Sequence, residues 1–559
     1  MHTFQRVTNK KSVLVFSPRV HNFYQSILNT VFANKYNLCL LMILAIALIF
    51  RLWQINQPYI DIISWRQTST AMMAENFFNN NSNIFFPEIN WSGPGPSYNG
   101  REFQTVSYIS ALLYHVFGQQ DWIGRAVAVL FGIWGNFALY RLVTKVWDKR
   151  NALAAAFVMA VSPLSILVER SFLPDPAMVS LVVTALWFFI EYLQNDKGKY
   201  LVLSAIFGSL GFLTKLPGLI VGLPALYAFI HISMSTGQLT RRRIRWVVSA
   251  GSIALIPVII YYLWARHLSL TYPPYHFAGE GNWVWNEGLI VYLKNRYFFR
   301  YLLVIAEYMM WGPILMGLFL LGMVVYPPSK ASVSGEKIDD NAPYFFHFWV
   351  IAFAIFYLIG ARELTVNFWN FHILSPAIAA FAGRSVVLVF DFQKRRGILP
   401  VLRLMIVVIA LCFSAYKIMK SNLDERVTKS GYKMALALKN IRQKGDLVVT
   451  LPELPGDPFP IYYSRSRGWT FPPMEIDGRF YKTSVLPERE EELIELIELL
   501  RNKKAKWFAL VKKQYDFFKE QKPQFYNYLT QKLIVHEEAA DYVIFDLATP
   551  FKQEEISLP

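Results

Sequence analysis

The sequence predicts a polytopic α-helical membrane protein followed by a C-terminal soluble α/β domain. Three observations support this fold class. Hydrophobic residues make up 54% of the 559 positions. Apolar runs long enough to cross a bilayer recur from residue 36 to residue 418, and the composition becomes typical of a soluble protein from about residue 420. Because a backbone in lipid must satisfy its own hydrogen bonds, the apolar runs are expected to be helices.

Membrane topology explains the net charge of +17 without nucleic acid as a partner. Most Lys and Arg residues stand in short loops between apolar runs, the pattern that keeps such loops in the cytoplasm. These basic faces would also meet anionic lipid head groups, so the bilayer is the expected partner. The two cysteines, Cys39 and Cys412, both lie in apolar runs, which excludes a disulfide scaffold and a Cys-based metal site.

The first apolar run, 36–55, is predicted to be a retained membrane anchor. It follows a basic segment, 1–35, expected in the cytoplasm, and it ends without the small-residue pattern of a cleaved signal peptide. The helix therefore runs outward and places the loop 56–121 on the extracytoplasmic side. Within this loop, the short apolar stretch 102–117 is expected to be an interfacial helix on the outer membrane surface.

About eleven membrane spans are predicted in total within a transmembrane domain of residues 36–418. This topology is supported by three basic clusters, 149–150, 241–245 and 394–396, which all fall on the same side. The spans after the first are 122–146, 151–168, 176–193, two helices within 200–233, 247–265, 298–325, 345–360, 368–390 and 399–418.

The last span delivers residues 419–559 to the extracytoplasmic side. There, amphipathic helix patterns at 431–443 and 488–502 precede strand patterns at 447–450 and 507–511. A further strand is expected near 542–546. This alternation predicts a small α/β domain. It contains no Gly-rich phosphate loop and no metal-ligand spacing.

Asp61 is the most informative residue of the chain. It stands with Trp65 and Arg66 where the first membrane helix meets water, and ionisable groups at that depth are expensive and usually mark a site. A carboxylate can accept a proton from an attacking hydroxyl, and cations can stabilise charge on a departing phosphate. Other charged residues at the outer helix junctions could join Asp61 around one cavity: Glu102, Arg170, Asp175, Lys215 and Arg362.

Each of these residues also has a structural interpretation. Asp61 and Asp175 could cap helices, and Glu102 could be a solvated helix start. His372, within the apolar run 368–390, is expected to be a packed histidine and not a ligand. Three basic residues could be membrane-interface anchors, whose side chains extend their charged ends into the water. They are Arg170, Lys215 and Arg362.

Six short motifs follow one another along about residues 40–390. They are Asp61 with Trp65-Arg66-Gln67, Arg101-Glu102-Phe103 before a helix ending at Phe117-Gly118, Arg125, Arg170 to Asp175, Leu213-Thr214-Lys215, and Asn367 to Asn370 continuing through Pro376-Ala377. In this order they resemble bacterial GT-C glycosyltransferases, in the subgroup of the protein O-mannosyltransferases and the lipid A aminoarabinose transferase. The C-terminal domain also resembles the periplasmic domain of many bacterial members.

The resemblance implies a GT-C type fold and an inverting glycosyltransferase. Such an enzyme moves a single sugar from a polyprenyl-phosphate carrier to a protein, lipid or glycan acceptor on the periplasmic face of the bacterial inner membrane. It implies that Asp61 is the catalytic carboxylate, assisted by Glu102 and Asp175. The implied substrate-binding residues are Arg66 and Lys215 on the carrier phosphate, together with Trp65, Arg170 and Arg362.

Two questions stay open at this point. Many family members follow the first Asp with Glu, whereas Ile62 follows Asp61 here, which disfavours a metal held by a paired acidic motif. A divalent ion bridging Asp61, Asp175 and phosphate is an alternative. A transporter or flippase of lipid-linked sugars, or a non-catalytic membrane assembly subunit, would be the alternative functions. No inverted repeat accompanies the helix break at 215–217.

Overall fold

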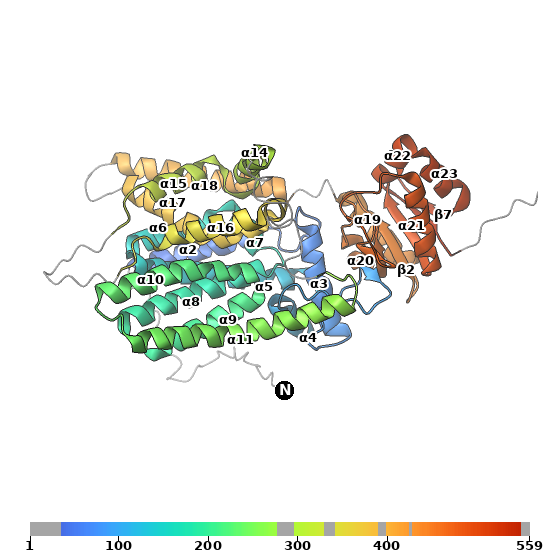
Figure 1. Ribbon diagram of the computed structural model, residues 1–559. Helices are drawn as coiled ribbons and strands as arrows, with labels where there is room; N and C mark the ends of the chain where they lie inside the picture. Colours follow the sequence, from blue (N-terminus) through green and yellow to red (C-terminus); the bar gives the residue numbers. More distant parts are fainter. Residues whose placement is uncertain are drawn as a thin grey trace, which may run out of the picture.

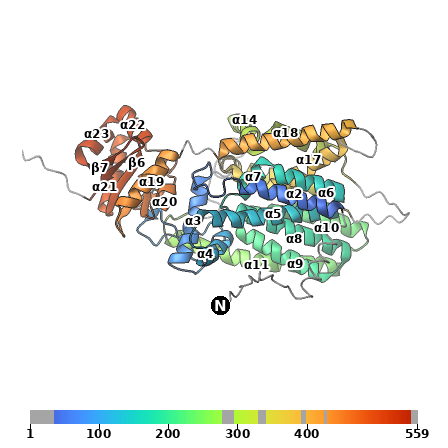
Figure 2. The same ribbon diagram turned by 180° about the vertical axis from the view of Figure 1, so that it is seen from behind.

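A computed structural model of the protein describes residues 35–276, 294, 296–328, 341–389, 398–423 and 428–548. Figure 1 shows a bundle of long helices with a strand-containing domain at one end. Helices α3 (Ser64–Asn79) and α4 (Thr105–Phe117) lie between the bundle and that domain, and the reverse view in Figure 2 shows the same order. The residues that follow the first membrane helix therefore stand where the two parts meet.

Every predicted span coincides with an apolar helix or with consecutive helices. Seven helices in the described ranges are long and apolar enough to cross a membrane, or up to nine if each of two bent pairs is one span. The chain is thus a multi-pass helical membrane protein, and the count of eleven remains a prediction. The helices are α2 (Lys35–Leu52), α5 (Asp121–Val146), α6 (Lys149–Val161) with α7 (Pro163–Glu169), α8 (Asp175–Asn195), α9 (Gly198–Thr214), η1 (Leu216–Val221) with α10 (Gly222–Ser235), α11 (Arg241–Thr271), α14 (Arg296–Ile305) with η2 (Ala306–Met310) and α15 (Gly312–Val324), α16 (Phe345–Val366), η3 (Phe368–Leu374) with α17 (Ser375–Val389), and α18 (Ile398–Asn422).

Helix α8 forms the centre of the bundle. In its most apolar stretch 89% of the residues are buried, against 22% in α11 and 17% in α18. The outer helices instead expose large apolar side chains, for example Ile256 and Leu263 of α11. This distribution fits a bundle whose surface meets lipid, because lipid tails solvate apolar side chains that water would not.

A bend between α6 and α7 brings a charged segment into the interior. The two helices meet at 63°, and Pro163, the first residue of α7, has no N–H to continue the ladder of α6. All residues from Pro163 to Asp175 are buried. The sequence predicted a single helix, 151–168, so the continuity of that helix was wrong.

The C-terminal domain is built on a six-stranded sheet of order β1-β3-β2-β6-β8-β7. The middle strands β3, β2 and β6 are parallel, and the others pair antiparallel. Strands β2, β6 and β8 cover the three predicted strand positions. The strands are β1 (Ser92–Gly93), β2 (Leu447–Leu451), β3 (Arg467–Thr470), β6 (Ala505–Val511), β7 (Ile534–Glu538) and β8 (Tyr542–Asp546), with helices α19 (Lys429–Ile441), α20 (Phe459–Tyr463), α21 (Glu490–Asn502), α22 (Lys512–Gln521) and α23 (Pro523–Lys532).

Strand β1 comes from the loop 56–121 and not from the C-terminal residues. Ser92 pairs with Trp469, and Gly93 pairs with Gly468. A side chain on Gly468 would collide with the backbone of Val448, since a Cβ there would lie 1.8 Å from the Val448 carbonyl oxygen. The loop after the first membrane helix is therefore hydrogen-bonded into the sheet of the domain that ends the chain.

The short apolar stretch in this loop forms helix α4, which has two unlike faces. Val106, Ser110 and Tyr114 are buried, whereas Leu112 and Val116 are exposed. This spacing of three to four residues is that of an amphipathic helix. The position of α4 at an outer membrane surface remains a prediction.

Candidate functional site

The side chain of Asp61 is fully buried just before helix α3. Its Oδ1 accepts hydrogen bonds from the backbone N–H of Ile63 at 3.0 Å and from Nε2 of Gln67 at 2.8 Å. Its Oδ2 faces two guanidinium groups, Arg125 Nη2 at 3.5 Å and Arg170 Nη1 at 3.7 Å. Burial of a carboxylate is costly unless it is paired, and these two arginines supply the pairing.

The same two arginines hold the backbone that leads to Asp61. Arg125 of α5 donates to the carbonyl oxygens of Ile55, Gln57 and Pro58. Arg170, at the end of α7, donates to those of Trp53 and Gln54. A planar guanidinium can make several directed hydrogen bonds at once. The turn between α2 and Asp61 is therefore fixed from the bundle side.

Gln67, in the first turn of α3, orients the carboxylate of Asp61. While its Nε2 donates to Asp61, its Oε1 accepts hydrogen bonds from the N–H of Phe172 at 3.2 Å and from Nε of Arg125 at 3.4 Å. Gln67 is fully buried. Both the nitrogen and the oxygen of the Gln67 amide are hydrogen-bonded, so the amide has one orientation. It therefore also fixes the orientation of the Asp61 carboxylate.

A second group of charges, the lysine cluster, consists of Arg66, Glu102, Asp175, Lys215 and Asn370. Lys215 Nζ lies 2.7 Å from Asp175 Oδ1, 2.7 Å from Asn370 Oδ1 and 3.9 Å from Glu102 Oε1. Arg66 pairs with Glu102. The members come from five elements: α3, the segment before α4, the first residue of α8, the junction of α9 with η1, and η3.

The lysine cluster is less deeply buried than Asp61. The side chains of Arg66 and Glu102 keep 13% and 16% exposure, against 0% for Asp61. Burial by itself would raise the pKa of Glu102. The charges of Arg66 and Lys215 outweigh it and hold the pKa of Glu102 below its usual range. The cluster thus presents two cations and a stable carboxylate at a partly open position.

The structure thus sorts most of the predicted site residues into two groups, linked by the consecutive residues Arg66 and Gln67 in the first turn of α3. Arg170 joins Asp61, whereas Glu102, Asp175, Lys215 and Arg66 share the lysine cluster. The ring of Trp65 lies edge-on to that of Trp91, with centroids 6.4 Å apart. Arg362 lies on helix α16, and its side chain falls outside the described residues.

The structure also tests the alternative, purely structural roles of these residues. Asp61 accepts a hydrogen bond from the N–H of Ile63, but Ile63 is itself the N-cap residue of α3 and has no side-chain cap, so Asp61 is not the cap of this helix. Arg170 and Lys215 do not reach for water, because their side chains are 0% and 8% exposed and face carboxylates. His372 is fully buried, and its Nε2 lies 3.2 Å from Oε1 of Glu169.

A divalent ion between Asp61 and Asp175 does not fit these residues. Within the described ranges, no three or more His, Cys, Asp or Glu side chains gather in a metal-binding arrangement. Asp61 Oδ2 already faces two guanidinium groups, and Asp175 Oδ1 holds the ammonium of Lys215. Calcium and magnesium need several oxygen ligands, and neighbouring cations would repel them.

Sequence reasoning missed the contacts of this region with the C-terminal part of the chain, of which Asp457 gives one. Ser64, the first residue of α3, donates a hydrogen bond from Oγ to Oδ2 of Asp457 in the C-terminal domain, 393 positions away. Nothing in the pattern around Asp457 pairs it with α3. Gln67, Arg125 and Asn370 stand in the resembling motifs, but only their contacts assign them a place in the site.

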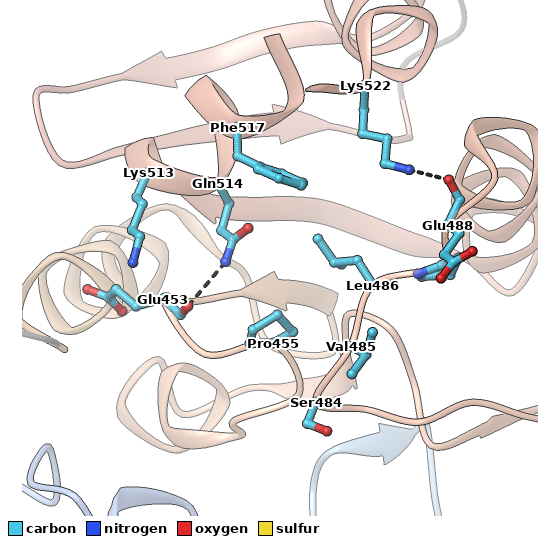
Figure 3. Close-up of a pocket in the computed structure, with 11 residues that line it drawn as sticks. Glu453, Pro455, Ser484, Val485, Leu486, Glu488, Lys513, Gln514, Phe517 and Lys522 are labelled. Atoms are coloured by element: carbon cyan, nitrogen blue, oxygen red, sulfur yellow. Dashed lines mark hydrogen bonds between the residues drawn. The ribbon is translucent and has the colours of Figure 1, made fainter. Parts of the chain in front are cut away.

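A cavity of about 470 Å³ lies in the C-terminal domain, apart from both charged groups. Figure 3 shows it between the segment after β2, which carries Glu453, and helix α22, which carries Gln514 and Phe517. Gln514 Nε2 donates to the carbonyl oxygen of Glu453 at 3.1 Å. The cavity is thus at the carboxyl ends of β2 and β6, where open α/β sheets commonly form crevices.

Comparison with known proteins gives one family match. Residues 105–264 match the model of the family described as dolichyl-phosphate-mannose-protein mannosyltransferase. The matched range is less than half of the chain. It begins at helix α4 and ends within α11, so it includes Asp175 and Lys215 but neither Asp61 nor the C-terminal domain.

A curated relative points the same way. The Bacillus subtilis (strain 168) protein YkcB, whose name provisionally describes a mannosyltransferase, is 25% identical over 177 residues. These residues are 32% of this chain and 24% of YkcB. The chain therefore aligns with about a quarter of its relative's length.

Two solved structures share the fold over most of the chain. ArnT from Cupriavidus metallidurans, bound to undecaprenyl phosphate, has a TM-score of 0.57 at 13% identity and covers 91% of this chain and 99% of ArnT. The oligosaccharyltransferase of Archaeoglobus fulgidus has a TM-score of 0.55 at 14% identity, covering 88% and 71%. Residues 105–264 thus resemble mannosyltransferases in sequence, and the chain shares its fold with ArnT and with the oligosaccharyltransferase.

Proposed function

We propose that the protein transfers a single sugar from a polyprenyl-phosphate carrier to an acceptor on the extracytoplasmic face of a bacterial inner membrane, with inversion at the anomeric carbon. The observation that carries the proposal is the lysine cluster together with a buried, oriented Asp61, two groups linked by the neighbouring residues Arg66 and Gln67 of α3. One group offers two cations that can bind a phosphate, and the other offers a carboxylate that can bind a proton. ArnT, which shares the fold, was solved with undecaprenyl phosphate, a carrier of the proposed class.

The proposed step is a direct displacement. The acceptor hydroxyl oxygen forms a bond to the anomeric carbon while the bond from that carbon to the carrier phosphate oxygen breaks. The electron pair leaves with the carrier phosphate, and the hydroxyl proton passes to a carboxylate. Charge therefore grows on the phosphate, where positioned cations stabilise the transition state more than the ground state.

Arg66 and Lys215 are the proposed phosphate ligands. In the protein alone each is balanced by a carboxylate, Arg66 by Glu102 and Lys215 by Asp175. A phosphate oxygen arriving between them would take over charge-assisted hydrogen bonds that these carboxylates now accept. Arg362, Trp65 and Arg170 remain proposed further substrate contacts, with Arg170 acting through its position beside Asp61.

Asp61 is the proposed catalytic carboxylate. Its Oδ2 lies 3.5 and 3.7 Å from the two guanidinium groups, longer than a charge-assisted hydrogen bond. This oxygen therefore keeps a lone pair for the acceptor proton, while Oδ1 is fully engaged. Catalytic hydrogen bonds often tighten only when substrate is bound. Asp175 and Glu102 would assist in contacts with the acceptor or the sugar.

Purified protein incubated with radiolabelled polyprenyl-phosphate sugars tests the proposal. Mannose heads the panel because the family model and YkcB both carry its name. We expect slow release of free sugar without an acceptor and transfer of label to a protein, lipid or glycan when membrane lysate is added. Asp61→Asn should lose this turnover, and Asp541→Asn, a change in the C-terminal domain, should keep it. Binding without turnover in the wild type would favour the transporter or a non-catalytic subunit.

The extracytoplasmic position of the C-terminal domain is tested by labelling in intact cells. Leu454 is 55% exposed, so Leu454→Cys, in a protein whose Cys39 and Cys412 are replaced by Ser, offers one accessible thiol. A membrane-impermeant maleimide should label it without cell lysis. Labelling only after lysis would place the domain in the cytoplasm and refute this part of the proposal.

A further inference from the structure

We call residues 57–64 the Asp61 loop. Arg125 and Arg170 fix this region from the helix bundle, and residues from the C-terminal part of the chain fix it from the opposite direction. Figure 1 shows α20 of the C-terminal domain beside α3, and the two helices are in contact. The bonds to the loop are Gln57 Nε2 to the Leu423 carbonyl, Tyr59 N–H to the Tyr463 hydroxyl, Thr428 Oγ1 to the Ile60 carbonyl, Ile62 N–H to the Asn422 carbonyl, and Ser64 Oγ to Asp457 Oδ2.

Among these contacts, the bond between Ser64 and Asp457 uses a buried ionisable group. Asp457 is only 2% exposed. Its Oδ1 accepts a hydrogen bond from the N–H of Phe459 at 3.1 Å, and its Oδ2 accepts the bond from Ser64. The acidic neighbours that act on it are Glu453 and Asp61. Burying a carboxyl group lowers the stability of the fold relative to burying an apolar side chain. A buried aspartate at this position is therefore expected to have a specific function.

The bond lies at the start of α3, where a helix is easily frayed. The first N–H groups of a helix have no partner within it. The residue before α3 is Ile63, whose side chain cannot cap. Besides the bonds of Gln67 and the bond from the Ser64 N–H to the Asp61 carbonyl, this turn is anchored by Asp61, which accepts from the Ile63 N–H, and by Asp457, which accepts from the Ser64 hydroxyl.

We propose that Asp457 is a positioning residue: by holding Ser64, it fixes the first turn of α3, from which Arg66 reaches the lysine cluster and Gln67 reaches Asp61. The C-terminal domain then completes the site, although none of its side chains has to touch the sugar. The effect on turnover rests on the proposed function. The effect on α3 itself does not.

The consequences differ between substitutions of Asp457. Asp457→Ala removes the bond to Ser64 and lets the first turn of α3 fray, so we expect kcat to fall by about tenfold through misplacement of reacting groups. The KM for the donor should change less than kcat, because only one of the two proposed phosphate ligands, Arg66, stands on α3, whereas Lys215 lies on another element. Asp457→Asn should restore most of kcat, since its amide can donate to Ser64 while its oxygen accepts from Phe459.

Hydrogen exchange of the peptides that cover residues 61–70 tests the anchoring without any turnover. We expect faster exchange in Asp457→Ala and in Ser64→Ala than in the wild type, and near wild-type exchange in Asp457→Asn. Asp541→Ala is the matched control, because Asp541 also accepts a bond from a serine hydroxyl, that of Ser430 at 3.1 Å, but within its own domain. Unchanged exchange in Asp457→Ala would overturn the proposal.

Turnover of the same variants tests the positioning role. The double variant Ser64→Ala with Asp457→Ala should be no slower than either single variant, because both remove one bond. If Asp457→Ala keeps the full kcat while Asp61→Asn is inactive, the positioning role is wrong and the proposed function stands. If Asp61→Asn stays active, the catalytic assignment of Asp61 is wrong, and the exchange rates alone decide whether Asp457 anchors α3.

Discussion

Lys215 Nζ lies 2.7 Å from Oδ1 of Asp175, and these residues, 40 positions apart, form an ion pair with side chains only 8% and 1% exposed. The pair joins the start of α8 to the junction of α9 with η1. This ion pair contributes both to the stability of the fold and to the proposed phosphate site. Its removal should therefore change both the thermal midpoint and the binding of a lipid phosphate.

The first prediction concerns this pair. Lys215→Met leaves Asp175 buried without its cation, which should lower the free energy of unfolding by about 3 kcal/mol and lower the thermal midpoint in detergent. Binding of undecaprenyl phosphate should weaken in the same variant. Lys433→Met is the control, because the pair of Lys433 with Asp541 is largely exposed and exposed pairs contribute little. Equal thermal midpoints for wild type and Lys215→Met would contradict the prediction.

The second prediction separates hydrogen-bonding geometry from charge at Arg125. Arg125→Lys keeps the positive charge, but an ammonium cannot reach three backbone carbonyls and Asp61 together. We expect turnover to fall by about a hundredfold through misplacement of the Asp61 loop, together with a lower thermal midpoint.

Arg141→Lys provides the comparison on the same helix. Arg141 is 40% exposed and lies 3.9 Å from Glu191, so this variant should keep both turnover and midpoint. Similar behaviour of the two variants would show that Arg125 acts only through its charge.

The third prediction concerns Glu102, which balances Arg66 in the protein alone. Glu102→Gln removes a negative charge next to both cations, so an arriving phosphate no longer competes with it. Undecaprenyl phosphate should bind more tightly, by about threefold for a change in one nearby charge. Turnover should fall, since the proposed assisting carboxylate is lost. Weaker lipid phosphate binding in this variant would contradict the proposed phosphate site.

The fourth prediction is a pH dependence of stability. Burial raises the pKa of Asp457 from 3.8 to about 7. Between about pH 4 and pH 7 the folded protein therefore holds a proton that the unfolded chain has released, so this group's contribution to stability falls as the pH rises. Above pH 7 both forms are ionised, and the contribution is constant.

Thermal midpoints of the wild type and Asp457→Asn, measured from pH 4.5 to pH 8, test this dependence. The midpoint of the wild type minus that of the variant should decrease with pH and level off above about pH 7. Other acidic groups, including Glu453 and Asp61, are present in both proteins, so the difference isolates Asp457. A constant or rising difference would mean that Asp457 is ionised throughout.

Prediction from sequence succeeded where the pattern is local. The apolar runs located the bundle helices, with ends that differ by up to about six residues, because a span needs a continuous apolar stretch that a sequence displays directly. The motifs around Asp61, Asp175 and Lys215 likewise stand at helix ends, where charge interrupts apolar residues. The prediction failed at α6 and α7, where Pro163 begins a second helix at an angle to the first in place of the single predicted helix 151–168.

The sequence by itself determined that this is a multi-pass helical protein with charged residues at particular helix ends, since length, apolarity and local spacing are properties of the linear chain. Only the tertiary structure decided which charges meet. It paired Lys215 with Asp175, set Arg125 and Arg170 against Asp61, and brought Asp457 to Ser64 across 393 positions. Such pairs depend on how helices pack and where the chain bends. The interaction energies of these pairs come from contacts between residues far apart in the sequence. A pattern along one segment of the chain therefore cannot predict them.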